Sequence, residues 1–102
     1  ARCTENGDLK GEGVAIDHFG NLITNIKSEQ LTECLPAGPR EEIQIRIRSN
    51  VIKGLSETYA SVGSNTLLAL IGSRGYLEIA INRGNAAQHL NAEKGENVWV
   101  VL

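Results

Sequence analysis

The chain has 102 residues, a formal net charge of -2 and 22% charged residues. This length fits one domain, and the near-neutral charge argues against a nucleic-acid footprint or a polybasic membrane surface. No apolar run approaches the roughly 20 residues of a membrane span, and the start does not resemble a signal peptide. We therefore expect a small globular domain in the cytoplasm, without nucleic-acid or membrane partners.

Cysteine and methionine usage gives two further expectations. Cys3 and Cys34 are too few for a disulfide scaffold and lack the spacing of a metal site. A reduced, intracellular pair is the default expectation. Methionine is absent, including at position 1, which indicates a processed product or a fragment.

The first third of the chain predicts a short leader followed by a strand pair and a helix. Residues 1–10 have no apolar period and are predicted to form a linker or a frayed start. The β-branched runs at 13–17 and 22–26 predict two paired strands. Ser28 is expected to cap a short helix over residues 29–34.

The rest of the chain predicts mostly short strands. Isoleucines alternate with polar residues over 42–48, which predicts a half-buried strand with Ile43, Ile45 and Ile47 inward. Further elements are predicted as strands at 51–55, 67–71, 76–81 and 98–102 and a short helix at 86–90 capped by Asn85. About seven short strands with two short helices predict an all-β fold, a small antiparallel closed or nearly closed β-barrel. A β-sandwich is the alternative.

The turn between the strands at 67–71 and 76–81 is a candidate anion site. Ser73 and Arg74 stand between Gly72 and Gly75. A hydroxyl beside a planar guanidinium can hold a carboxylate or a phosphate. The alternative is an ordinary hairpin turn with a solvated arginine.

Four further residues are open to two interpretations, one structural and one as ligand-binding groups. Asp17 can bind an ammonium group or cap its own turn. Asn21 can pair with an adenine edge or simply shape the turn. Phe19 can stack on a heterocycle or belong to the core, and Tyr59 lies in a polar segment where a surface or ligand role is open.

Other polar side chains carry weaker signals. Asn25 can close a local hydrogen bond, and Glu78 is a carboxylate in an apolar strand that needs a partner if it faces inward. His18 and His89 are isolated and are expected to be exposed. No nucleophile–base pair, metal cluster or phosphate loop is present in the sequence. We therefore predict ligand-binding groups but no catalytic or metal-binding residue in this chain.

Two segments together resemble the S-adenosylmethionine hydroxide adenosyltransferase family, which is related to fluorinase and chlorinase. Residues 16–26, IDHFGNLITNI, resemble its signature IDxFGNxxTNI. Residues 72–82, GSRGYLEIAIN, resemble its second signature, and residues 84–87 match the small-residue tail. The resemblance covers residues 11–102 and only the family's C-terminal β-barrel domain; the larger N-terminal α/β domain is absent.

The resemblance implies that this chain is one part of an enzyme. Intact members are trimers that cleave S-adenosylmethionine, their substrate, to adenosine and methionine by attack of water or hydroxide on the ribose C5′. Each active site lies between the N-terminal domain of one subunit and the C-terminal domain of its neighbour. The groups that position the nucleophile belong to the absent domain, so this chain alone is expected to be inactive. No cofactor is implied.

The resemblance also assigns a substrate clamp to this domain. By this resemblance, Asp17 and Ser73 contact the amino group of the methionine moiety. Ser73 and Arg74 contact its carboxylate. By the same resemblance, the adenine is bound by the amide of Asn21 and by the backbone near Arg83. The aromatic rings of Phe19 and Tyr59 pack beside it.

Two departures from the halogenating relatives favour the branch that uses water. His18 and Phe19 are adjacent, where the halogenases carry an intervening proline, and Ile81 stands where they carry an arginine. Two alternatives remain from the residues alone. One is a nucleotide- or nucleic-acid-binding β-barrel module without enzymatic activity, and the other is a structural assembly domain.

Overall fold

The computed structural model describes residues 2–4, 7–35, 42–57, 63 and 65–101. The strands are β1 (Arg2–Cys3), β2 (Leu9–Ile16), β3 (Leu22–Lys27), β4 (Gln44–Ile47), β5 (Asn50–Lys53), β6 (Leu67–Ile71), β7 (Tyr76–Ile81) and β8 (Asn97–Val101). The helices are α1 (Ser28–Cys34) and α2 (Ala86–Leu90). Neither of these helices is long and apolar enough to cross a membrane.

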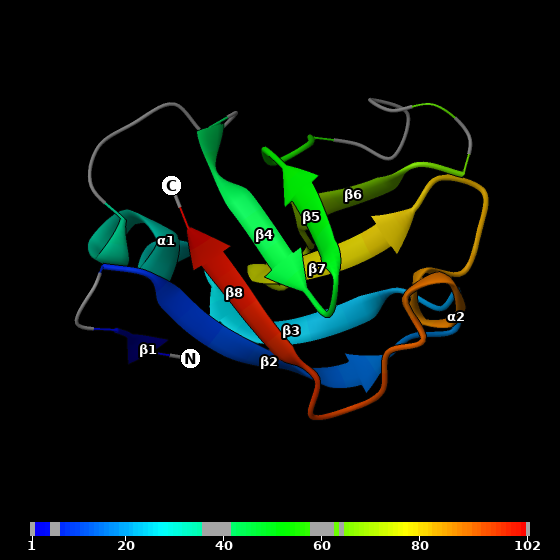
Figure 1. The fold of residues 1–102 in the computed structure, drawn as a ribbon, viewed down its shortest axis with the longest axis horizontal. Coiled ribbons are helices and arrows are strands. Elements are labelled where there is room, and N and C mark those ends of the chain that lie inside the picture. Colours follow the sequence, from blue (N-terminus) through cyan, green and yellow to red (C-terminus); the bar gives the residue numbers. More distant parts are fainter. Residues whose placement is uncertain (1, 5–6, 36–41, 58–62, 64, 102) are drawn as a thin grey trace.

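The strands form one antiparallel sheet that curls into a nearly closed barrel. Its order is β5-β4-β8-β2-β3-β7-β6, and β1 pairs with β2 beside this path. Figure 1 shows β4, β5 and β8 crossing in front of β2, β3 and β7. Just after β5, the Ser56 N–H donates to the Ala69 carbonyl of β6 at 2.8 Å, which brings the two ends of the sheet together. The predicted nearly closed barrel with two short helices is confirmed.

The core lies inside the barrel and follows the period of two along the strands. Ile43, Ile45 and Ile47 are no more than 6% exposed, as their alternation with polar residues predicts. The fully enclosed residues come from several strands and include Leu9, Leu22, Ile26, Leu77, Ile79, Val98 and Val100. The barrel interior is therefore filled by aliphatic side chains, and ligand sites have to lie on its outer face or at its rim.

Thr24 is a polar side chain that is fully buried among them. The Thr24 hydroxyl donates to the Leu77 carbonyl at 2.7 Å and accepts the Ile26 N–H at 3.2 Å. These bonds fall where the register of β3 against β7 shifts, between Ile23 and Lys27. The hydroxyl thus replaces ladder hydrogen bonds that the irregular pairing leaves open.

Thr24→Val is expected to lower the free energy of unfolding by about 1–3 kcal/mol, because it keeps the side-chain shape but leaves a buried carbonyl and a buried N–H without a partner. Urea unfolding followed by circular dichroism measures this change. The matched control is Thr32→Val on the exposed side of α1, which is expected to change stability by less than about 0.5 kcal/mol. Equal effects of the two variants would contradict a bonding role for Thr24.

The start of the chain differs from the expected linker. Arg2–Cys3 form β1, and β2 begins at Leu9, where Leu9 pairs with Val100 and Lys10 with Trp99 of β8. The Lys10 ammonium also lies 5.3 Å from the centre of the Trp99 ring. The β8 partners of Leu9 and Lys10 are Val100 and Trp99, at the other end of the chain, so no local period reveals this part of β2.

Two further expectations are wrong. Cys3 and Cys34 form a disulfide, with their Cα atoms 5.5 Å apart, because the β1–β2 pairing brings the first residues beside the end of α1. Ser28 is the first residue of α1, not its cap. The Lys27 N–H instead donates to the Gln30 side-chain oxygen at 2.9 Å, which gives the first turn its capping bond.

Candidate functional site

The turn between β2 and β3 is held by the carboxylate of Asp17. Its Oδ1 accepts the N–H groups of Phe19 at 2.9 Å and of Asn21 at 3.0 Å. Its Oδ2 accepts from the Asn21 side-chain amide at 3.2 Å. The Asx-capping interpretation of Asp17 is therefore confirmed, and Asn21, which is 5% exposed, owes its orientation to this carboxylate.

The same turn is packed against the start of α2. Gly20 has a φ of +85°, and a Cβ at this position would overlap the carboxamide of Asn85. The Gly20 carbonyl accepts the Ala87 N–H at 2.9 Å. Asn85 in turn caps α2 by accepting the Gln88 N–H at 3.0 Å, as predicted. Glycine at position 20 thus lets the turn lie directly against the segment that follows β7.

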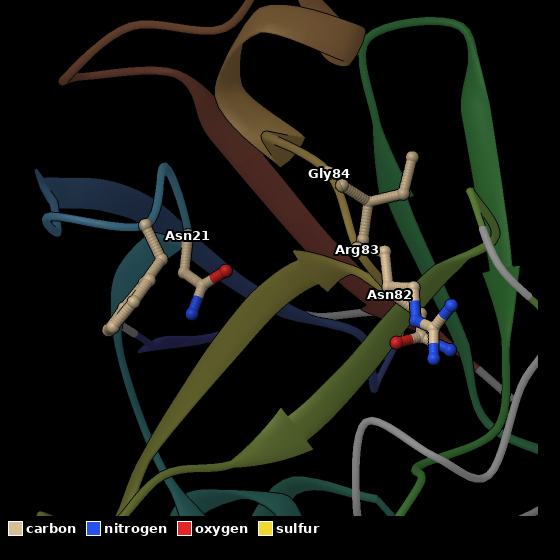
Figure 2. Close-up of a pocket in the computed structure, with 6 residues that line it drawn as sticks. Asn21, Asn82, Arg83 and Gly84 are labelled. Atoms are coloured by element: carbon tan, nitrogen blue, oxygen red, sulfur yellow. The ribbon is translucent and has the colours of Figure 1, made fainter.

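A first pocket, the Phe19 pocket, lies between this turn and the end of β7. It has a volume of about 440 Å³ and is lined by Phe19, Asn21, Ile81, Asn82, Arg83 and Gly84. Figure 2 shows Asn21 on one side of it and Asn82 and Arg83 on the other. Phe19 is 73% exposed, so its interpretation as a core residue is wrong. An exposed aromatic ring and an oriented amide beside a backbone segment suit a flat heterocycle.

A second pocket, the Arg74 pocket, has a volume of about 600 Å³ and lies along β2, β3 and β7. Its polar lining includes Asp17, Ser73, Arg74, Tyr76 and Glu78. The side chains of Ser73 and Arg74 are exposed at its edge. It therefore offers a guanidinium, a hydroxyl and two carboxylates to one ligand.

The turn that carries Ser73 and Arg74 is fixed at both ends. The Gly75 N–H donates to the Gly72 carbonyl, and the Gly72 N–H donates to the Tyr76 carbonyl, each at 2.9 Å. Gly75 has a φ of +85°, which a tight turn of this kind requires of its last residue. The Ser28 N–H donates to the Gly75 carbonyl at 2.9 Å, which ties the turn to the start of α1.

Glu78 lines the Arg74 pocket, although the sequence interpretation considered this residue without assigning it to the substrate site. Its side chain is half-buried in the Arg74 pocket, and burial and then the nearby charge of Asp17 raise the pKa of its carboxyl group. The signal that could have found it is the period of two along β7, which puts Tyr76 and Glu78 on one face of the strand next to the Ser73–Arg74 turn.

The two pockets follow one another along β7 and the residues just after it. Glu78 lines one pocket and Asn82 the other. Four residues of strand span roughly 13 Å, and the turn from Asp17 to Asn21 lines both pockets. The structure therefore brings Asp17, Ser73 and Arg74 to one pocket and Phe19, Asn21 and Arg83 to the next. Tyr59 lies outside the described residues.

The remaining candidates have structural roles or none. The Asn25 side-chain oxygen accepts the Glu12 N–H at 2.9 Å, which is the local hydrogen bond considered for it. His18 and His89 are exposed, and the His18 ring contacts Phe19 edge-on with the ring centres 5.6 Å apart. Among the described residues, no group of three or more His, Cys, Asp or Glu side chains could hold a metal ion.

The structure is thus a small, nearly closed β-barrel domain with a filled interior and two pockets on its outside. Residues 11–99 match the family model described as the SAM hydroxide adenosyltransferase C-terminal domain. The chain belongs to this family.

Relatives of this chain include halogenating and hydrolytic enzymes. The fluorinase of Actinopolyspora mzabensis is 34% identical over 105 residues, covering 98% of this chain and 34% of the relative. The (R)-S-adenosyl-L-methionine hydrolase of Thermus thermophilus is 30% identical over 86 residues, covering 84% and 29%. The chain thus spans about a third of the length of these curated relatives.

The fold also matches solved structures. An uncharacterized conserved protein from Thermotoga maritima superposes with a TM-score of 0.82 at 28% sequence identity. The match covers 98% of this chain and 38% of the Thermotoga chain. The barrel therefore also occurs as part of longer chains.

Proposed function

We propose that this chain is the substrate-binding domain of an enzyme that cleaves S-adenosylmethionine with water or hydroxide to adenosine and methionine. The observation that carries the proposal is the pair of adjoining pockets in a member of this family. S-adenosylmethionine has an aromatic base at one end and an amino acid at the other, and the pockets offer matching groups in that order.

The Arg74 pocket takes the methionine moiety in this proposal. The Arg74 guanidinium pairs with the carboxylate, since its planar fork matches two carboxylate oxygens. Ser73 lies next to it and contacts both the carboxylate and the amino group. Asp17, in the turn between β2 and β3, faces the ammonium group. The substrate enters as the reactant, and the proposal includes no cofactor.

The Phe19 pocket takes the adenine. Phe19 stacks on one face of the base, and the amide of Asn21 faces a base edge, where a carboxamide can donate and accept at once. The backbone near Arg83 lies on the opposite side of the pocket and supplies a further contact. Tyr59 is proposed as a second wall on the strength of the sequence resemblance alone.

Exposed apolar side chains next to the pockets indicate where the rest of the enzyme covers the substrate. Val14 is 45% exposed and Ile16 is 40% exposed, on the part of β2 that leads into the Asp17 turn. An N-terminal domain of the family, from a neighbouring subunit of a trimer, would bury them. It would also supply the nucleophile site, where orientation and desolvation lower the barrier for attack at C5′.

The test compares two forms of the protein with S-adenosylmethionine. The full-length protein, meaning this barrel together with the N-terminal domain of the family, is expected to release adenosine and methionine, which chromatography detects. The 102-residue chain alone is expected to release neither. Turnover by the isolated chain would contradict the proposed division of labour. Formation of a 5′-halogenated nucleoside in fluoride or chloride would assign the halide-using branch instead.

Arg74→Ala in the full-length protein is expected to weaken substrate binding by about 1.5–3 kcal/mol, the range for a hydrogen bond to a charged group. Calorimetry with S-adenosylhomocysteine measures the effect without turnover, because its neutral thioether is a poor leaving group. The matched control is Arg46→Ala, which removes an exposed guanidinium from the outer face of β4. Unchanged affinity after Arg74→Ala would exclude the carboxylate role.

A further inference from the structure

Asp17 has little hydrogen-bonding capacity left for a ligand. A carboxylate offers about four acceptor positions, and three of those on Asp17 already receive the Phe19 N–H, the Asn21 N–H and the Asn21 side-chain amide. An ammonium group has three N–H donors to place. Asp17 therefore serves mainly as the support of its turn and can accept one bond more.

Glu78 has the capacity that Asp17 lacks. Its carboxylate lines the Arg74 pocket, and none of the hydrogen bonds or ion pairs found among the described residues involves it. Its side chain lies against the Cα of Gly72, where a Cβ would overlap the carboxylate. Glycine at position 72 thus leaves room for this carboxylate directly beside Ser73.

We propose that Glu78 is a substrate-binding residue that accepts a hydrogen bond from the α-ammonium group of the ligand, together with Ser73 and the remaining acceptor position of Asp17. This inference rests on the proposed function and adds a residue to its site. The three acceptors match the three ammonium donors, while Arg74 binds the carboxylate of the same amino acid. Glu78 then makes the pocket selective for an amino acid over a ligand without an amino group.

The electrostatics of the pocket agree with this role. Burial and then the charge of Asp17 raise the pKa of Glu78, because this carboxylate is partly desolvated and lies near a second one. The charged or titratable groups that line this pocket with it are Asp17, Arg74 and Tyr76. A bound ammonium adds a positive charge beside the two carboxylates, so binding requires ionised Glu78 and weakens as the pH falls through the raised pKa of this group.

The test is Glu78→Gln in the full-length protein, with calorimetric titrations of S-adenosylhomocysteine and of adenosine. Affinity for S-adenosylhomocysteine is expected to fall on the order of tenfold or more, the size of one charge-assisted hydrogen bond. Affinity for adenosine, which has no amino group, is expected to stay unchanged. The exposed Glu93→Gln is the matched control and is expected to change neither affinity.

Two further readouts separate binding from folding. Ionisation of Glu78 disfavours the fold because its folded pKa is raised, so its stability contribution is lost as the pH rises through that pKa. Glu78→Gln is therefore expected to be at least as stable as the wild type at neutral pH. The decline of S-adenosylhomocysteine affinity between about pH 7 and pH 4 is expected to begin at lower pH in Glu78→Gln.

The outcomes distinguish this inference from the proposed function. If the wild type binds neither S-adenosylhomocysteine nor adenosine, the proposed function fails and the inference with it. If the wild type binds both and Glu78→Gln binds both equally well, only the role of Glu78 is excluded. Equal losses for both ligands would also exclude it, since they indicate a general change of the pocket.

Discussion

Asp17→Ala is expected to lower the free energy of unfolding by about 2–4 kcal/mol and to weaken binding in both pockets. The substitution removes three hydrogen bonds that hold the β2–β3 turn, each made to a charged and partly buried carboxylate. Asn21 loses the bond that orients its amide, so adenosine affinity is expected to fall together with affinity for the amino-acid moiety. Urea unfolding and calorimetry with adenosine and S-adenosylhomocysteine measure the two effects.

Asp17→Asn is the matched variant that separates the turn from the ligand contact. An asparagine oxygen can still accept the N–H groups of Phe19 and Asn21, because asparagine forms the same turn. Asp17→Asn is therefore expected to retain most of the stability and of the adenosine affinity, while affinity for S-adenosylhomocysteine falls. If Asp17→Ala is as stable as the wild type, the hydrogen bonds of this turn do not support the fold as described.

Removing the disulfide with Cys3→Ser and Cys34→Ser together is expected to lower the free energy of unfolding by about 2–4 kcal/mol. The bond joins residues separated by 31 positions, and such a crosslink restricts the unfolded chain more than the folded one. Chemical denaturation of the oxidised wild type and of the double variant, both without reductant, measures the difference. A reductant is expected to bring the wild type down to the stability of the variant.

The double variant is also the control for effects of the reductant itself. Its stability is expected to be the same in the presence and in the absence of reductant. Identical unfolding of the oxidised and reduced wild type would mean that the crosslink contributes nothing. Adenosine affinity provides a second control, because neither cysteine lines either pocket.

The barrel was predictable because its strands carry their own signals. The alternation of Ile43, Ile45 and Ile47 fixes which face is buried, and the turn residues between apolar runs fix where most strands end. The strand residues Leu9 and Lys10 were missed because they pair with β8 at the far end of the chain. The disulfide was missed because Cys3 meets Cys34, 31 positions away, only after β1 has paired with β2.

The candidate site was also predictable only in part. Turn residues such as Asp17 and Arg74 were accessible to sequence reasoning because binding residues are disproportionately found on loops between regular elements. Their grouping into two pockets depends on the antiparallel pairing of β3 with β7, which sets Ile23 opposite Glu78. Glu78 was undervalued because the period of two along β7, which places it on the same face as Tyr76, was not used to decide which way this carboxylate faces. The exposure of Phe19 was equally invisible, since an aromatic residue next to apolar strands is usually core.

The closure of the barrel has a consequence for its dynamics. The described ends of the sheet, β5 and β6, are neighbours without a ladder of their own, and the bond from Ser56 to Ala69 joins the chain next to them. Local opening, as amide hydrogen exchange reports it, is therefore expected to begin along this seam. Of the three strands that line the Arg74 pocket, β3 pairs with β2 on one side and with β7 on the other, away from this seam. The barrel can then fluctuate at its seam while the face that carries the pockets stays ordered.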